Sequence, residues 1–336
     1  MDNTRSSDSL RGALGAALGM CFVGTLAAVS ATLGDYPLYG GQALRYAVAA
    51  AILFGAIRIA SRRRGDLAPR IGTRRKITAG MGRGVGGREV LLLVALAATG
   101  LAGFNVCVFT ATEYAGPATV GTVIATSPVV LSLVGPLLAR RRPHPLVVAA
   151  AVVVAAGAAL STGLGDGSTR GLLPSLGALV GEVCFSLLAV PLLPKLGPVR
   201  VSAYSAAFAA PMLLATGLIV DGREVVRMPT AGEAAGLAYL AAIVTTIAFF
   251  LWYDAIGRIG ADRAGLFAGL IPVSAVVTTM ALGLGRPGTA DLVGSALVAA
   301  GVVVGMRAGR GEGKERKEAP EASAVAAGPA ARPARV

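Results

Sequence analysis

The sequence predicts an all-α integral membrane protein with ten transmembrane helices arranged as two inverted five-helix repeats. Of its 336 residues, 54% are hydrophobic and only 15% are charged, a balance that a soluble domain of this size rarely shows. Uncharged stretches long enough to cross a bilayer recur along the whole chain, and the second half repeats motifs of the first half at a constant spacing. Lipid is therefore the expected surrounding of most of the chain.

Ten segments reach or nearly reach the length of a span, because a helix rising 1.5 Å per residue must cross roughly 30 Å of hydrocarbon. Seven are uncharged: 13–34, 90–112, 114–139, 143–165, 201–220, 234–253 and 264–285. Three more are admitted when one charge is allowed: 40–60 with Arg45, 171–194 with Glu182 and 288–306 with Asp291. The organisation that follows is an N-terminus (1–12), a first repeat (13–163), a second repeat (171–306) and a tail (307–336).

The net charge of +13 is distributed in the way that orients membrane proteins, which argues against a nucleic acid as the partner. With alternating spans and an inside N-terminus, sixteen Lys and Arg residues of the internal connections fall on the inner side. The outer connections hold only Arg170, Arg223, Arg227 and Arg286. The bias places both termini in the cytoplasm and the chain in a bacterial-type inner (plasma) membrane.

Two polar segments carry no apolar periodicity and are predicted to be unstructured: the basic cytoplasmic loop 61–89, rich in Arg and Gly, and the tail 307–336. The glycines at 82, 84, 86 and 87 imitate a dinucleotide loop, but no strand precedes them, so a solvated basic loop near anionic headgroups is the better interpretation. Cys21, Cys107 and Cys184 lie inside predicted spans without metal-like spacing. No cofactor and no metal are expected.

An internal repeat is the most informative feature of the organisation. Ser127-Pro128-Val129 matches Ile271-Pro272-Val273, and Gly157 matches Gly301, at a constant shift of 144 residues. Nearer the start of each half the shift grows to about 161, which brings Pro37 over Pro198. Each half holds five spans, and because five is odd the second half inserts upside down. Inverted repeats form two mirror-related gates around a midplane site, which favours transport by alternating access.

The residues resemble the drug/metabolite transporter superfamily and its EamA-like ten-helix members, over about residues 13 to 306. The resemblance rests on motifs whose order and spacing recur in both halves: Pro37 followed by Gly41-Gln42-Ala43-Leu44-Arg45-Tyr46, Tyr114-Ala115 leading to Ser127-Pro128-Val129, Ile271-Pro272-Val273, and Asp291-Leu292-Val293-Gly294 with Ala300-Gly301-Val302. It implies a secondary transporter, often an exporter of amino acids, other metabolites or drugs, with a central cavity lined by both halves.

The chain departs from that family in one motif. Members often carry Leu-Gly-Glu near the end of the fourth and ninth helices, where this chain has Leu138-Ala139-Arg140 and Leu284-Gly285-Arg286. Gate contacts assigned to those glutamates therefore do not carry over.

Glu182 is the leading candidate for a functional side chain, because it is a lone carboxylate near the middle of the sixth span. An intramembrane acid is costly unless it faces a cavity or a partner, and burial disfavours its ionised form. We expect it to face the cavity and to bind either a proton or a cationic substrate group. The alternative is a hydrogen-bonded glutamic acid that ties two helices together.

Two further polar residues lie within spans. Arg45, near the outer end of the second span, is either a snorkelling side chain or a functional one that contacts an anion or pairs with Asp35 at the cavity mouth. Asn105, in the middle of the third span, is either a hydrogen bond between helices or a donor in the cavity.

Pro128 and Pro272 break the helical ladder at equivalent depths of the two halves and free backbone carbonyls. Ser127 and Ser274 stand beside these breaks as candidate cavity residues, although a plain kink that improves packing explains the prolines as well.

Trp252 and Tyr253 are expected to be interfacial belt residues at the cytoplasmic end of the eighth span. Four glycine pairs allow close helix approach, within one chain or between protomers of a homodimer: Gly15/Gly19, Gly177/Gly181, Gly265/Gly269 and Gly301/Gly305.

Two other classes of function are weaker. Gly163-Leu164-Gly165-Asp166 and Tyr253-Asp254 imitate the motifs of intramembrane aspartyl proteases, but their order is reversed and the two aspartates are predicted at opposite membrane surfaces. A scaffold or sensor acting through the cytoplasmic tail leaves the repeat unexplained.

The sequence therefore predicts a transporter and no enzyme, moving a small metabolite, amino acid or drug outward through the lipid bilayer. Protons acting through Glu182 are the simplest energy source, because no nucleotide-binding motif is present.

Overall fold

The computed structural model describes residues 2–30, 33–66, 85–115, 117–163, 169–283, 286 and 288–326, and these form helices and connections without a strand. The first half contains α1 (Asp2–Gly24), α2 (Leu26–Ser30), α3 (Leu38–Asp66), α4 (Gly87–Ala95), η3 (Leu96–Gly103), α5 (Phe104–Tyr114), α6 (Pro117–Ile124), α7 (Ser127–Leu138) and α8 (Pro145–Thr162). The second half contains α9 (Thr169–Leu187), α10 (Leu193–Val220), η4 (Gly222–Val225), α11 (Ala231–Tyr239), η5 (Leu240–Ile247), α12 (Ala248–Ile259), α13 (Ala261–Gly265), η6 (Leu266–Gly269), α14 (Leu270–Ala281) and α15 (Thr289–Ala326).

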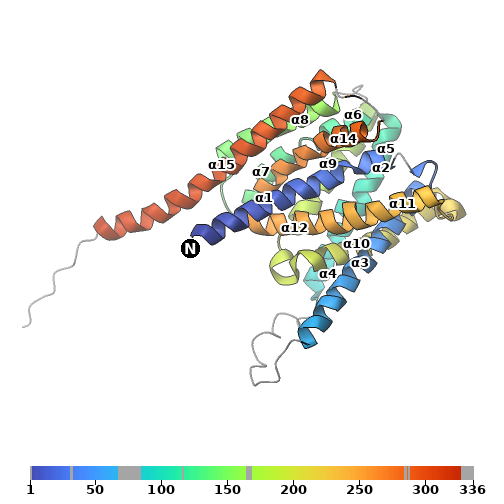
Figure 1. Cartoon of the computed structure of the whole chain (residues 1–336), viewed down its shortest axis with the longest axis horizontal. Helices are drawn as coiled ribbons and strands as arrows, with labels where there is room; N and C mark the ends of the chain where they lie inside the picture. The colour runs from blue at the N-terminus through green and yellow to red at the C-terminus, as the bar shows by residue number, and fades with distance from the viewer. Residues whose placement is uncertain are drawn as a thin grey trace, which may run out of the picture.

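Ten helical segments of the described chain are long and apolar enough to span a membrane, which confirms the predicted number. The bundle in Figure 1 is bounded by two close helix pairs, α8 with α15 on one side and α3 with α10 on the other. Each pair joins corresponding spans of the two halves, the fifth with the tenth and the second with the seventh. This pairing is the arrangement expected of two related halves packed face to face.

The predicted repeat extends into details of the backbone. Two spans contain a π-helical segment, Leu96–Gly103 in the third and Leu240–Ile247 in the eighth, and the two segments are 144 residues apart at both ends. π-helices are rare and concentrate at functional sites. Their occurrence at matching positions indicates a feature of the repeat unit and not an accident of one helix.

Glycines also pack in matching ways in the two halves. A Cβ at Gly15 would lie 3.5 Å from Leu251 O, and a Cβ at Gly177 would lie 2.7 Å from Cys107 Sγ. The two glycines are 162 residues apart and the residues that they meet are 144 apart. A Cβ at any glycine of the four pairs would meet atoms of a neighbouring helix within 4 Å, so these glycines allow close packing inside the bundle.

The fourth and ninth spans are interrupted near the two prolines. Between α6 and α7 the helix is broken at residues 125–126, and Pro128 stands in the first turn of α7, where a missing N–H costs nothing. In the ninth span the 3₁₀ turn η6 precedes α14, which has Pro272 as its third residue. Both spans are therefore assembled from short helical pieces at equivalent depths.

Two expectations of unstructured chain need correction. α15 continues to Ala326, so the part of the tail from 307 to 326 is helical. Its Ala, Glu, Lys and Arg residues favour a helix, whereas Gly309, Gly311, Gly313 and Pro320 of the same stretch do not, so helix propensity alone does not account for this extension. In the basic loop, α3 continues to Asp66 and α4 begins at Gly87, while residues 67–84 and 327–336 lie outside the described chain.

Candidate functional site

A central cavity of about 510 Å³ lies between the two halves of the bundle and is lined mostly by apolar side chains. Its volume is in the range of pockets that hold small organic ligands. Six of the seven predicted site residues line it: Arg45, Asn105, Ser127, Pro128, Glu182 and Pro272. Ser274 does not, because its hydroxyl donates to Cys21 O at 2.6 Å and so joins α14 to α1.

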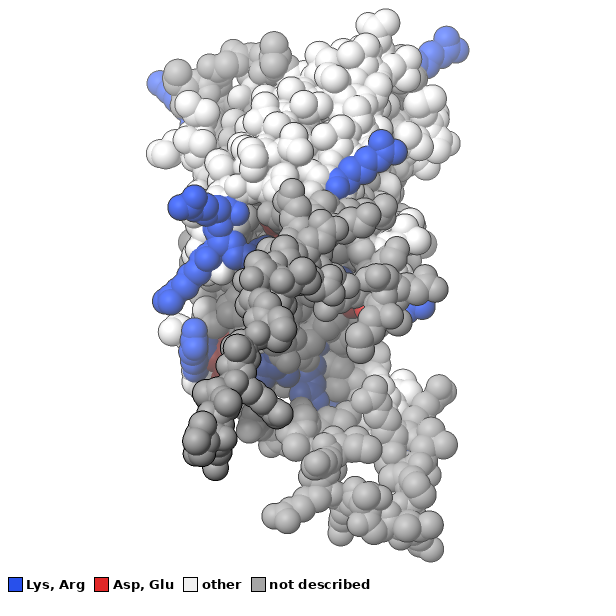
Figure 2. Space-filling view, turned by 90° about the vertical axis from the view of Figure 1, so that its left-hand side faces the viewer, with Lys and Arg blue, Asp and Glu red and all other residues white. Residues whose placement is uncertain are grey.

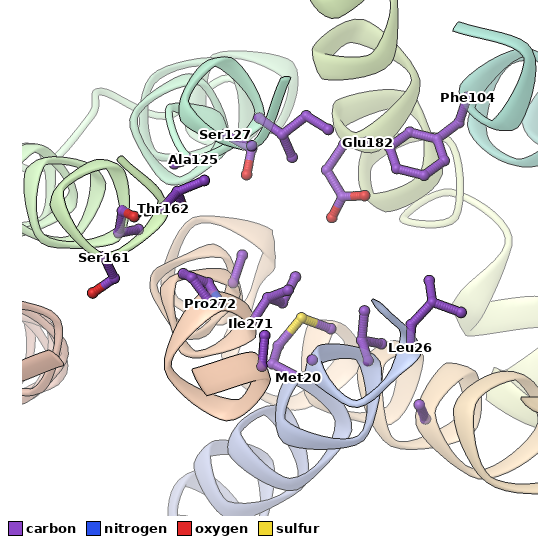
Figure 3. A pocket seen from close by; sticks show the side chains of 18 of the residues that line it. Met20, Leu26, Phe104, Ala125, Ser127, Ser161, Thr162, Glu182, Ile271 and Pro272 are labelled. Atoms are coloured by element: carbon purple, nitrogen blue, oxygen red, sulfur yellow. Dashed lines mark hydrogen bonds between the residues drawn. The ribbon is translucent and has the colours of Figure 1, made fainter. Parts of the chain in front are cut away.

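Glu182 points into the cavity from α9, with Ser127, Met20 and Phe104 around it (Figure 3). Helix α9 can approach the third span closely here because Gly181 carries no side chain: a Cβ would lie 2.9 Å from Thr99 O. Among the described residues no hydrogen bond or ion pair to the Glu182 carboxylate is found. The alternative of a carboxyl group that ties two helices together therefore lacks a partner in this part of the chain.

Arg45 is buried, with only 4% of its surface exposed, so it does not snorkel to the membrane surface. Its Nε donates to Thr245 Oγ1 at 2.6 Å and one terminal nitrogen donates to Gln42 Oε1 at 3.1 Å. The guanidinium also lies 5.3 Å from the centre of the Tyr46 ring. Neither Asp35 nor any other carboxylate of the described chain forms an ion pair with it.

Asn105 combines the two roles that the sequence left open. Its Nδ2 donates to Leu101 O at 2.7 Å and to Tyr46 OH at 3.3 Å, so it links the third span to α3 while it lines the cavity. Leu101 belongs to the π-helical segment η3.

Thr245 on η5 was missed by sequence reasoning. Its hydroxyl donates to Leu240 O, five residues earlier, at 2.9 Å and accepts the hydrogen bond from Arg45. The i−5 spacing of its backbone acceptor matches the π-helical spacing of the surrounding turns. The π-helical segments of both halves thus lie beside the buried polar groups of the cavity.

A cluster of aromatic residues closes one end of the cavity. Phe185 lies 4.8 Å from Phe249 and 5.0 Å from Tyr253 between ring centres, and Phe249 lies 6.4 Å from Tyr253. Trp252 lines the cavity and donates from Nε1 to Ser186 Oγ at 3.2 Å. With 1% and 0% of their surfaces exposed, Trp252 and Tyr253 are core residues, and their prediction as belt residues was wrong. The i, i+3, i+4 spacing of Phe249, Trp252 and Tyr253 could have indicated a shared face.

The cavity reaches the opposite end of the bundle. Thr162, the last residue of α8, lines it together with Arg286 and Asp291 at the start of α15. Beyond the aromatic cluster is a second hollow lined by Tyr253, Asp254, Arg258, Pro194 and Pro198 among others. The aromatic cluster therefore lies between the second hollow and the cavity, which extends to the exposed Arg286 at the opposite end.

Ion pairs join helices at the end of the bundle that holds the second hollow. Lys195 pairs with Glu89 at 2.8 Å, which links α10 to α4, and Arg258 pairs with Asp8 at 2.9 Å and Asp254 at 2.6 Å, which links α12 to α1. Figure 2 views the molecule from the side of the N-terminus and shows Lys and Arg side chains on that face. Asp254 is thus engaged with a cation, while Asp166, its partner in the protease alternative, lies outside the described residues.

Comparison with known proteins identifies one family and two similar proteins. The sequence model of the EamA-like transporter family matches residues 10–163 and 172–306. An "Uncharacterized transporter YetK" of Bacillus subtilis (strain 168) is 24% identical over 187 residues, which cover 54% of this chain and 57% of that protein. A solved protein titled "Crystal structure of protein" superposes with a TM-score of 0.67 at 23% identity, covering 90% of this chain and 97% of the other. The superposition on the solved protein shows a shared fold.

Proposed function

Because the chain belongs to the EamA-like transporter family, we propose that this membrane transporter is a secondary exporter of a small metabolite, amino acid or drug, working by alternating access. The observation that carries the proposal is the cavity between the two halves, which extends to the exposed Arg286 at one end and meets a cluster of aromatic side chains at the other. We interpret the first end as open and the second as closed. Inverted repeats provide a second state in which the closure is exchanged between the ends. The described arrangement is then one of two states of the cycle.

We further propose that protons drive the transport and that Glu182 carries them. The supporting observation is a carboxylate that points into the cavity and has no partner among the described residues. A group of this kind can hold a proton in one step and the ammonium group of a substrate in another. The substrate then reaches Glu182 when the closed end has opened, and the proton reaches it from the end that is open here. One carboxylate cannot hold both at once, so the two ligands exclude each other.

Glu182→Gln should abolish the coupling of transport to a pH gradient. The amide cannot bind a proton exchangeably, so we expect the rate of gradient collapse to fall about tenfold or more. The measurement uses vesicles that hold the purified protein, with pooled amino acids, amines and drugs as solutes. Glu113→Gln, which changes an exposed carboxylate at the end of α5, is the matched control.

Labelled-solute exchange without a pH gradient separates the two roles of Glu182. If Glu182→Gln keeps exchange and loses only gradient collapse, the carboxylate serves the proton. If both are lost, it also binds the solute. Normal collapse of the gradient by Glu182→Gln would remove Glu182 from the mechanism.

We also propose that both termini are cytoplasmic, so that the open end of the cavity faces outwards. The support is the distribution of sixteen inner against four outer basic residues in the connections. In a cysteine-free background, Met228→Cys, between α10 and α11, should react with a membrane-impermeant thiol reagent on intact bacterial cells. Ala139→Cys, after α7, should react only after the cells are opened. The reverse labelling pattern would show the opposite orientation in the membrane, and the described state would then be inward-open.

A further inference from the structure

Arg45 is a buried cation without a buried anion beside it. It is 4% exposed, it lines the cavity, and among the described residues no carboxylate lies within the 4.0 Å that defines an ion pair. A buried charge is costly unless it is paired, and breaking a buried pair by removing one partner is strongly destabilising. The guanidinium is therefore held in place by polar contacts while its counter-charge is missing.

The contacts of Arg45 hold the guanidinium without neutralising it. Thr245 Oγ1 accepts from Nε at 2.6 Å and Gln42 Oε1 accepts from a terminal nitrogen at 3.1 Å. Both acceptors are uncharged, and no hydrogen bond within the described chain uses the other terminal nitrogen. A guanidinium held in this way can present a planar set of donors, which matches the two oxygens of a carboxylate.

Helix packing does not explain the cation. In the register that places Pro37 on Pro198, 161 residues later, Arg45 corresponds to Ala206 of α10. Ala206 is completely buried in the core of the bundle. The repeat unit therefore packs at this depth without a charge, and the first half departs from it at a residue that lines the cavity.

We propose that Gln42, Arg45 and Thr245 form a carboxylate subsite, and that the transported solute carries a carboxylate that binds the Arg45 guanidinium. Arg45 contacts the solute, while Thr245 and Gln42 are positioning residues. The inference rests on the proposed transport function and adds a substrate class to it. The apolar walls of the cavity, with Phe104 and Phe249 among them, accommodate a hydrocarbon body attached to the carboxylate.

The chain provides its own probe of this site. Trp252 is the single tryptophan of the sequence, and it lines the cavity, so tryptophan emission reports binding there. The test compares L-leucine, 4-methylpentanoate and 3-methylbutylamine, which share the same five-carbon branched chain and differ in whether that chain carries a carboxylate, an ammonium group or both. Pools of other amino acids, their deaminated acids and their decarboxylated amines extend the comparison with the purified full-length protein.

The expected result is that carboxylate-bearing solutes bind and that removal of the carboxylate weakens binding about tenfold or more. Arg45→Gln should remove this preference by weakening the binding of the carboxylate-bearing solutes to about the level of the amines. Thr245→Val should weaken carboxylate binding, and Thr245→Ser, which restores the hydroxyl, should recover it. A purely structural threonine would change thermal stability without changing the ratio of acid to amine affinity.

Three outcomes would overturn the carboxylate subsite. Amines could bind as tightly as their parent amino acids, the Arg45→Gln variant could keep the preference for carboxylate-bearing solutes, or no carboxylate pool could change the tryptophan emission. Vesicle transport in parallel distinguishes this failure from failure of the proposed function. Transport of an amine or a neutral solute, with no effect of Arg45→Gln, would keep the transporter and remove only the subsite.

Discussion

Tyr253→Ala should open the closed end of the cavity. Tyr253 is fully buried, contacts Phe185 and Phe249, and lines the hollow on the far side of the aromatic cluster. Truncating a buried aromatic side chain costs about 3–5 kcal/mol in soluble cores, and about 3 kcal/mol lost from the closed state alone would change the equilibrium about a hundredfold. The variant should spend much more time with the second hollow and the cavity connected.

Thiol accessibility measures this opening. Cys21, Cys107 and Cys184 are first replaced by alanine, and Ala125→Cys then places one thiol in the cavity. A hydrophilic reagent supplied from the side of the N-terminus should label this cysteine slowly in the parent and at least about tenfold faster with Tyr253→Ala.

Phe109→Ala is the matched control for the gate, because Phe109 is the residue 144 positions before Tyr253. It packs against Tyr39 with ring centres 5.4 Å apart and belongs to neither the aromatic cluster nor the cavity lining. Its removal should leave labelling from the side of the N-terminus unchanged. Equal labelling rates in Tyr253→Ala and the parent would show that something other than the aromatic cluster closes this end.

The number of spans and the repeat register follow from the sequence because both depend on local chemistry. Uncharged length predicts a membrane helix, and Ser127-Pro128-Val129 and Ile271-Pro272-Val273 mark equivalent depths without knowledge of the fold. Glu182 could be singled out for the same reason, since a charge within a span needs a cavity or a partner wherever the helix packs.

Residues whose position depends on packing could not be predicted in this way. In a membrane protein the lipid-facing surface and the core are both apolar, so the periodicity that separates inside from outside in a soluble helix is lost. Trp252 therefore looked like a belt residue, although it is buried. Arg45 and Thr245 are 200 residues apart in sequence, and nothing local to either indicates their contact.

The π-helical segments were missed, and Ser274 was wrongly expected in the cavity lining, for a related reason. An extra residue in a helical turn leaves no mark in an uncharged and largely apolar stretch, as 96–103 and 240–247 show. Ser274 looked like a cavity residue because it follows the Pro272 break, but the acceptor of its hydroxyl is a carbonyl of α1. A polar residue near a break can satisfy a neighbouring backbone group as well as a ligand.

Gly157→Ala and Gly301→Ala should destabilise the protein to a similar degree. A Cβ at Gly157 would lie 2.7 Å from Gly294 O, and a Cβ at Gly301 would lie 2.9 Å from Ala150 O. These carbonyls are 144 residues apart, as the glycines are, so one contact between α8 and α15 is made twice. Backbone atoms yield little, and overpacking of this kind costs about 1–3 kcal/mol.

Thermal unfolding of the purified protein in detergent tests the pair, with Gly55→Ala as the control. Gly55 lies within α3 and a Cβ there would meet nothing within 4 Å, so alanine should leave stability unchanged or raise it slightly through its better helix propensity. A lower melting temperature for both α8 and α15 variants, but not for Gly55→Ala, is the expected result. If only one of the two variants were destabilised, the two contacts between α8 and α15 would contribute unequally to stability. The two halves would then share their backbone geometry but not the energies of their equivalent contacts.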